Sequence, residues 1–80
     1  MPSLGKQLEQ AREDVENVKR RIEEQSALIE RLQSDGHDTG AAVRLMATFL
    51  DLLNKLTVHR DTLEREAEER ARNQHRTPPR

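Results

Sequence analysis

The chain has no cysteine among its 80 residues, so disulfide bonds, thiolate catalysis and cysteine-based zinc sites are excluded. Aromatic residues make up 1% of the chain, and Phe49 is the single example. With 3 glycines and 3 prolines, the sequence also has no glycine-rich loop of the kind that cradles phosphate groups. These absences exclude several enzyme classes and leave little material for a compact globular core.

Long apolar runs are also absent, since no stretch approaches the ~18 residues that a membrane-spanning helix requires. The first residues, Met-Pro-Ser-Leu-Gly-Lys, lack the apolar centre of a signal peptide. We therefore expect a soluble, cytoplasmic protein that does not associate with a membrane.

Charge of both signs is what the chain has in abundance, because charged residues form 36% of it while the net charge is −1. Hydrophobic residues form 32%. Such a composition is typical of long helices and coiled coils. Disorder is the alternative for a chain of high charge and few aromatics, but mixed charge signs and regular hydrophobic spacing favour helices.

Hydrophobic residues in the first half recur in steps of four and three, which predicts one narrow apolar stripe on a helix over residues 4–33. Ser3 is the expected N-cap. One member of the series, Gln25, is polar and is predicted to fix the register of packing; the alternative is a glutamine in a loosely packed layer opposite Phe49. The series is Leu4, Leu8, Ala11, Val15, Val18, Ile22, Gln25, Ile29 and Leu32.

The second half repeats the same spacing and predicts a helix over residues 40–72. Its series is Ala42, Met46, Phe49, Leu53, Leu56, Arg60, Leu63 and Ala67. Residues 73–80 read NQHRTPPR, and Pro78 and Pro79 cannot continue a helix. We therefore expect this last segment to be a flexible basic tail.

Two amphipathic helices of similar length with a short link predict an all-α fold, a coiled-coil-like antiparallel hairpin over residues 1–72. A bend at residues 34–39 aligns Ala11 with Leu63, Leu8 with Ala67, and Gln25 with Phe49. Small residues then face large ones in the outer layers, as good packing requires.

The apolar face is too wide for one neighbouring helix to cover, which predicts a homodimeric four-helix bundle. A different protein partner and a monomer with scattered exposed leucines are the alternatives. The expected interface consists of Leu28, Leu45, Phe49, Leu50, Leu52, Leu53 and Leu56.

The residues of the bend, SDGHDTG, are predicted to form a turn and to cap the two helices. Gly36 suits a left-handed residue that ends a helix, and Asp38 and Thr39 are favoured N-cap types. His37 has no structural task of this kind. The alternatives are contact with a partner and a metal site formed by Asp35, His37 and Asp38, although three ligands within four residues rarely converge on one ion.

The sequence predicts no catalytic, cofactor-binding or metal-binding residues, and hence a non-enzymatic interaction protein that scaffolds or modulates another protein. The letters HRD at residues 59–61 match a kinase loop but lie within a predicted helix. The alternative is a nucleic-acid-associated regulatory factor, since Arg70, Arg72, Arg76 and Arg80 concentrate positive charge at the end of the chain. Nearby glutamates and the lack of aromatics for stacking weigh against it.

The segment from Ile22 to Glu66 resembles a family of short alpha-proteobacterial proteins. The shared features are a Gly-His-Asp-Thr turn, an apolar run with a phenylalanine, and a His-Arg pair before a leucine. They correspond here to Gly36, His37, Asp38, Thr39, Ala42, Phe49, His59, Arg60 and Leu63. The resemblance implies a helical hairpin but no particular activity.

Overall fold

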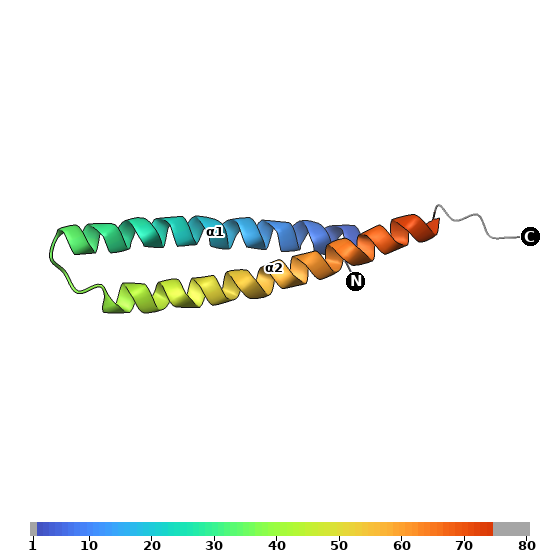
Figure 1. Ribbon diagram of the computed structural model, residues 1–80. Coiled ribbons are helices and arrows are strands. Elements are labelled where there is room, and N and C mark those ends of the chain that lie inside the picture. The colour runs from blue at the N-terminus through green and yellow to red at the C-terminus, as the bar shows by residue number, and fades with distance from the viewer. Residues whose placement is uncertain (1, 75–80) are drawn as a thin grey trace, which may run out of the picture.

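The computed structural model describes residues 2–74, which form two helices, α1 (Leu4–Ser34) and α2 (Gly40–Gln74) (Figure 1). The helices pack against each other as a hairpin, which confirms the predicted all-helical fold. With 31 and 35 residues, they are about 46 and 52 Å long at 1.5 Å per residue. Within the described residues, neither helix is long and apolar enough to cross a membrane.

Ser3 positions the start of α1. Its backbone is extended, and its Oγ accepts a hydrogen bond from the Lys6 N–H at 3.2 Å. Its carbonyl accepts from the Gln7 N–H at 3.0 Å. The hydroxyl thus satisfies one of the N–H groups that the first turn of a helix leaves without a partner, and Ser3 is the predicted N-cap.

A glycine ends α1. Gly36 has φ +74°, and its N–H donates to the Gln33 carbonyl at 3.2 Å. The His37 N–H reaches back to the Leu32 carbonyl at 2.8 Å. This pair of bonds is a Schellman motif, which reverses the chain direction and needs a left-handed residue that glycine adopts without steric penalty.

The chain enters α2 through Asp38 and Thr39. The Asp38 carboxylate accepts a hydrogen bond from the Gly40 N–H at 2.9 Å, and the Thr39 carbonyl accepts from the Val43 N–H at 2.9 Å. At the other end, α2 continues to Gln74, so Asn73 and Gln74 are helical and not part of a tail. Residues 75–80 of the expected tail lie outside the described residues.

The core occupies the half of the hairpin that is remote from the turn, which we call the open end. Leu8, Ala11 and Leu63 form a buried cluster, and Leu4 and Ala67 pack against it. Val15, the next inward-facing residue of α1 toward the turn, is 1% exposed. Ala11 and Leu63 therefore lie in one cluster, in agreement with the register expected from the sequence.

The half next to the turn is packed less completely. Its inward-facing hydrophobic residues are all half-buried, and within the described residues the buried member of this half is Gln25. The half-buried residues are Ile22, Ile29, Leu32, Ala42, Met46, Phe49, Leu53 and Leu56. In Figure 1 the two ribbons run apart near the turn and cross near the open end.

Candidate interaction surface

The large hydrophobic side chains that the hairpin leaves exposed all belong to α2, as far as the described residues go. Their exposed fractions are 49% for Val43, 45% for Leu45, 50% for Leu50, 41% for Leu52 and 58% for Val58. Isolated exposed leucines are ordinary, but four such residues within ten residues of one helix, from Val43 to Leu52, are not. This stretch is the strongest candidate for a functional surface.

The structure divides the predicted interface residues into two groups. Leu45, Leu50 and Leu52 are exposed, whereas the others are half-buried. The half-buried ones are Leu28, Phe49, Leu53 and Leu56. The prediction omitted Val43 and Val58; Val43 lies seven residues before Leu50, so the heptad spacing already placed it on the same side of the helix.

Four of the five exposed residues lie on two opposite sides of the seam between the helices, whereas Val58 lies on the outer side of α2. In a heptad, the residue before position a and the residue after position d flank the seam about 150° apart. Leu45 and Leu52 precede a positions, and Val43 and Leu50 follow d positions. The hairpin therefore presents apolar side chains on both of its faces, and a single neighbouring helix cannot cover both.

One of these faces also receives a leucine from α1. Leu28 precedes the a position Ile29, and it lines a shallow groove together with Phe49. Arg21, Glu24, Gln25 and Arg31 complete the lining. On α2, Phe49 lies four residues after Leu45 and three before Leu52, so these side chains are neighbours on the helix surface. We call the set Leu28, Leu45, Phe49, Leu52 and Leu56 the leucine flank.

Gln25 lies at the base of this groove. It is 7% exposed, and its Nε2 donates a hydrogen bond to the Ala42 carbonyl at 2.8 Å. The bond joins the two helices across 17 residues of sequence. Gln25 lines the same groove as Phe49, its predicted neighbour, but its polar partner is one the hydrophobic spacing did not indicate. A buried amide bonded to one carbonyl of the other helix favours one register of the helices.

The turn residues perform the local structural tasks described above. Asp35, His37 and Asp38 are exposed, and among the described residues no group of three or more His, Cys, Asp or Glu side chains is placed to hold a metal ion. The side chain of Asp38 is already engaged with the Gly40 N–H. The described turn residues therefore offer no assembled site of their own, and His37 contributes its backbone N–H to the Schellman motif.

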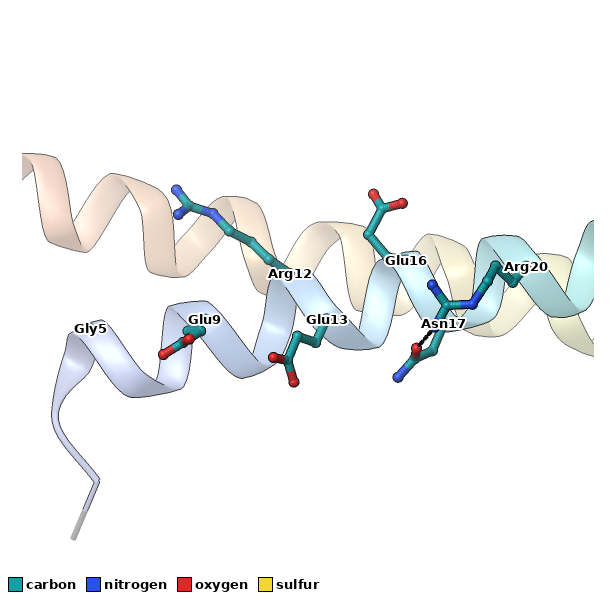
Figure 2. Close-up of a pocket in the computed structure, with 7 residues that line it drawn as sticks. All are labelled: Gly5, Glu9, Arg12, Glu13, Glu16, Asn17 and Arg20. Carbon is teal, nitrogen blue, oxygen red and sulfur yellow. Dashed lines mark hydrogen bonds between the residues drawn. The ribbon is translucent and has the colours of Figure 1, made fainter.

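The outer face of α1 carries charges of both signs. Figure 2 shows a surface depression whose lining residues all come from this one helix: Gly5, Glu9, Arg12, Glu13, Glu16, Asn17 and Arg20. Arg20 bonds to Asn17, and Arg12 reaches across to Glu64 of α2 at 3.4 Å. Interspersed charges on a single helix form a solvated face, with no nucleophile and base held together.

Arg60 occupies an inward-facing position on α2, next to the open end of the core. Its side chain is 26% exposed, and its guanidinium lies 3.0 Å from Asp61 and 4.0 Å from Glu64. The aliphatic part of the arginine can cover apolar neighbours while its head remains among carboxylates. This residue therefore continues the packed seam without contributing a buried charge.

The structure describes two of the four arginines singled out at the end of the chain. Arg70 and Arg72 are exposed on the last turns of α2, and Arg76 and Arg80 lie outside the described residues. Glu66, Glu68 and Glu69 are exposed on the turns just before them. Nucleic-acid binding by these arginines stays a prediction.

Comparison with known proteins adds no family assignment, because no family model, no curated protein and no solved structure matches the chain. The resemblance around the Gly-His-Asp-Thr turn stays a prediction from the sequence. The functional argument therefore depends on the surface of the hairpin itself, and above all on its uncovered apolar residues.

Proposed function

We propose that this chain is a non-enzymatic interaction protein that self-associates through α2 into a homodimeric four-helix bundle, and that the bundle scaffolds or modulates another protein. The observation that carries the proposal is the exposure of Val43, Leu45, Leu50 and Leu52, each between 41 and 50% exposed. Burying such side chains contributes about 25 cal/mol per Å² of apolar area, so a second copy that covers them lowers the free energy.

The incomplete layer beneath these residues supports the same proposal. Phe49, Leu53 and Leu56 point into the seam of the hairpin yet are half-buried. In a four-helix bundle each helix has two neighbours, so a stripe wider than one seam is what such a helix needs. A second hairpin would complete this layer as well as cover its flanks.

The experiment is a measurement of molar mass by light scattering over a range of concentrations. We expect twice the 9.3 kDa mass of the single chain. The variant Leu45→Glu/Leu50→Glu places a charge on each face of the hairpin and should reduce the mass to that of one chain, because a buried unpaired carboxylate costs several kcal/mol.

The matched control is Ala47→Glu/Asn54→Glu, which adds the same charge at exposed positions on the outer side of α2. It should leave the dimer mass unchanged. A cooperatively folded wild-type chain of 9.3 kDa at millimolar concentration would overturn the proposal, as would a control that dissociates as readily as the leucine variant.

A further inference from the structure

We propose that the second hairpin lies on the leucine flank with its turn at the same end as the first, so that the two-fold axis runs along the length of the bundle. This orientation rests on the self-association proposed above and deepens it. It follows from the length of the hairpin, from the positions of apolar and charged residues along it, and from the contribution of α1 to one face.

The area needed for a stable dimer favours contact along the whole hairpin. A hairpin about 46 Å long, made of two helices each about 10 Å wide, presents a face of roughly 900 Å². Standard interfaces bury about 800 Å² per partner. Contact restricted to the half near the turn would provide roughly 450 Å², well short of that value.

Two full-length arrangements remain, one with both turns at the same end and one with the turns at opposite ends. They differ in which residues lie opposite one another on the leucine flank. The residues that directly precede an a position lie along this face of the hairpin. They are Gln7, Asp14, Arg21 and Leu28 of α1, and Leu45, Leu52, His59 and Glu66 of α2. On both helices the apolar members lie near the turn and the polar members near the open end.

With the turns at the same end, α1 lies against α2 of the second copy at the same heights as in the hairpin itself. Leu28 then lies beside the partner's Leu45, and Asp14 beside the partner's His59. The apolar ends of the two flanks meet, and no two like charges from the flanking positions lie at the same height along this contact. The arrangement therefore brings the leucines near the turn together, leaves the polar residues near the open end beside one another, and places the aliphatic part of Arg21 beside the partner's Leu52.

With the turns at opposite ends, each helix lies against its own copy in reverse. Leu45 would then lie against the partner's Glu66, and Leu28 against the partner's Gln7. Such contacts take a carboxylate and an amide out of water without supplying partners for them, which is unfavourable. The uneven distribution along the hairpin therefore selects the same-end orientation.

The choice between the two faces follows from α1. On the leucine flank it contributes Leu28, whereas on the opposite face its flanking residues nearest to that height are the exposed Ser26 and Gln33. Further along that opposite face, Arg12 and Glu64 already pair with each other within one hairpin. The leucine flank is thus the more apolar of the two faces and the better one for a second copy.

The absence of cysteine allows a direct test, because a single introduced cysteine gives one spin label per chain. We choose Ser34→Cys near the turn and Glu69→Cys near the open end, both exposed. Same-end packing predicts distances below about 30 Å between the two labels of a dimer at both positions, since the labels are separated by little more than the width of the bundle.

The alternatives give different pairs of distances. Opposite-end packing over the full length predicts more than about 40 Å at both positions, and overlap of the turn halves alone predicts more than about 60 Å at Glu69→Cys. Either result, in a sample whose mass is that of a dimer, would overturn the orientation while leaving self-association intact. A monomeric mass would instead overturn the proposed function.

A second pair of variants tests the face. Leu45→Glu/Leu52→Glu alters the leucine flank, and Val43→Glu/Leu50→Glu alters the opposite face with the same charge and the same seven-residue spacing. We expect the first pair to raise the dimer dissociation constant at least 100-fold and the second to change it less than 10-fold. The reverse order would show that the second copy lies on the other face.

Discussion

The two halves of the hairpin are built from the same heptad spacing but are packed very differently. At the open end, Leu8, Ala11, Val15 and Leu63 are each at most 8% exposed. In the half near the turn, the inward-facing hydrophobic residues are half-buried, and α2 there carries most of its exposed large side chains. An apolar residue at the correct spacing is therefore not always a buried residue.

Side-chain volume explains much of this difference. The open end sets Ala11 of α1 against Leu63 of α2, and Leu8 against Ala67, and small residues allow two helices to approach closely. Near the turn, the same register places Ile22 opposite Leu53 and Ile29 opposite Met46, which are large on both sides. Helix axes separated by larger side chains leave the layer between them more accessible.

The comparison indicates a division of tasks along the molecule. The open end holds the hairpin together through a small closed core, whereas the half near the turn offers apolar surface that one hairpin does not use. Four experiments test whether the two halves differ in this way, and the one with the largest expected effect comes first.

The largest effect concerns two leucines at equivalent positions of α2, seven residues apart. Leu63 is 5% exposed and Leu56 is half-buried. We expect Leu63→Ala to lower the free energy of unfolding by about 3 kcal/mol and Leu56→Ala by about 1.5 kcal/mol in dilute solution. Urea denaturation at several protein concentrations measures both values.

Concentration sharpens this test. If a second copy covers the half near the turn, the cost of Leu56→Ala should grow as the concentration rises, while that of Leu63→Ala changes less. Equal costs for the two variants in dilute solution would contradict the difference between the halves. If the difference between the two losses of unfolding free energy does not become smaller at higher protein concentration, a partner does not cover Leu56.

The turn provides a second test through its glycine. Gly36→Ala should lower the free energy of unfolding by about 1–2 kcal/mol, because a Cβ is unfavourable at φ +74°. Beyond the two adjoining residues, no atom of the described chain lies within 4 Å of the place that this Cβ would occupy, so the cost is conformational and not a clash.

Gly5→Ala is the matched control within α1. Its Cβ would meet only the Ser3 Oγ, at 3.9 Å, and alanine is up to about 1 kcal/mol more favourable than glycine in a helix. The two substitutions should therefore shift the melting temperature in opposite directions. If both substitutions shifted the melting temperature in the same direction, the left-handed backbone conformation would not be the reason why position 36 favours glycine.

A third test concerns the buried polar residue of the turn half. Gln25→Leu should raise the free energy of unfolding by about 1 kcal/mol, since apolar burial replaces a polar group whose acceptor, the Ala42 carbonyl, lies within a helix and keeps its backbone bond. The same substitution should weaken the preference for one register and yield more than one set of amide signals in NMR spectra.

Gln33→Leu serves as the comparison, because Gln33 is an exposed glutamine of the same helix. It should leave the number of amide signals unchanged. A Gln25→Leu variant with a single set of signals would mean that the hydrophobic layers alone determine the register.

The smallest effect is expected from the ion pair between the helices at the open end. Arg12 and Glu64 lie 3.4 Å apart, with side chains 58% and 38% exposed. A double-mutant cycle with Arg12→Ala and Glu64→Ala should give a coupling energy of about 0.5 kcal/mol or less in low salt, and close to zero in 1 M salt. A coupling energy above 1 kcal/mol would show that this ion pair, and not the buried core alone, stabilises the open end.

Local signals in the sequence were sufficient for the framework of the fold. Ser3 and Gly36 act as the expected cap and helix stop, and the four-and-three spacing led to two helices that pack as a hairpin. These features depend on interactions within a few residues of each other, which is why composition and spacing reveal them. The candidate surface was located on α2 for the same reason, because the excess of leucines is visible in the spacing itself.

What the sequence could not predict depends on how closely the two helices approach. Spacing alone assigned Val15 and Leu53 to equivalent layers, yet one is buried and the other half-buried. The partner of Gln25 also escaped prediction, because a flexible amide can reach several carbonyls and only the final separation of the helices selects that of Ala42.

The two helices, their caps and the reversal of direction between them follow from the order of residues, since each depends on backbone hydrogen bonds and side chains close together along the chain. Which layers close and which stay open depends on the packing of the two helices, because packing brings together the volumes of residues from distant parts of the sequence. The closed layers at the open end and the uncovered leucines near the turn are both consequences of that second step.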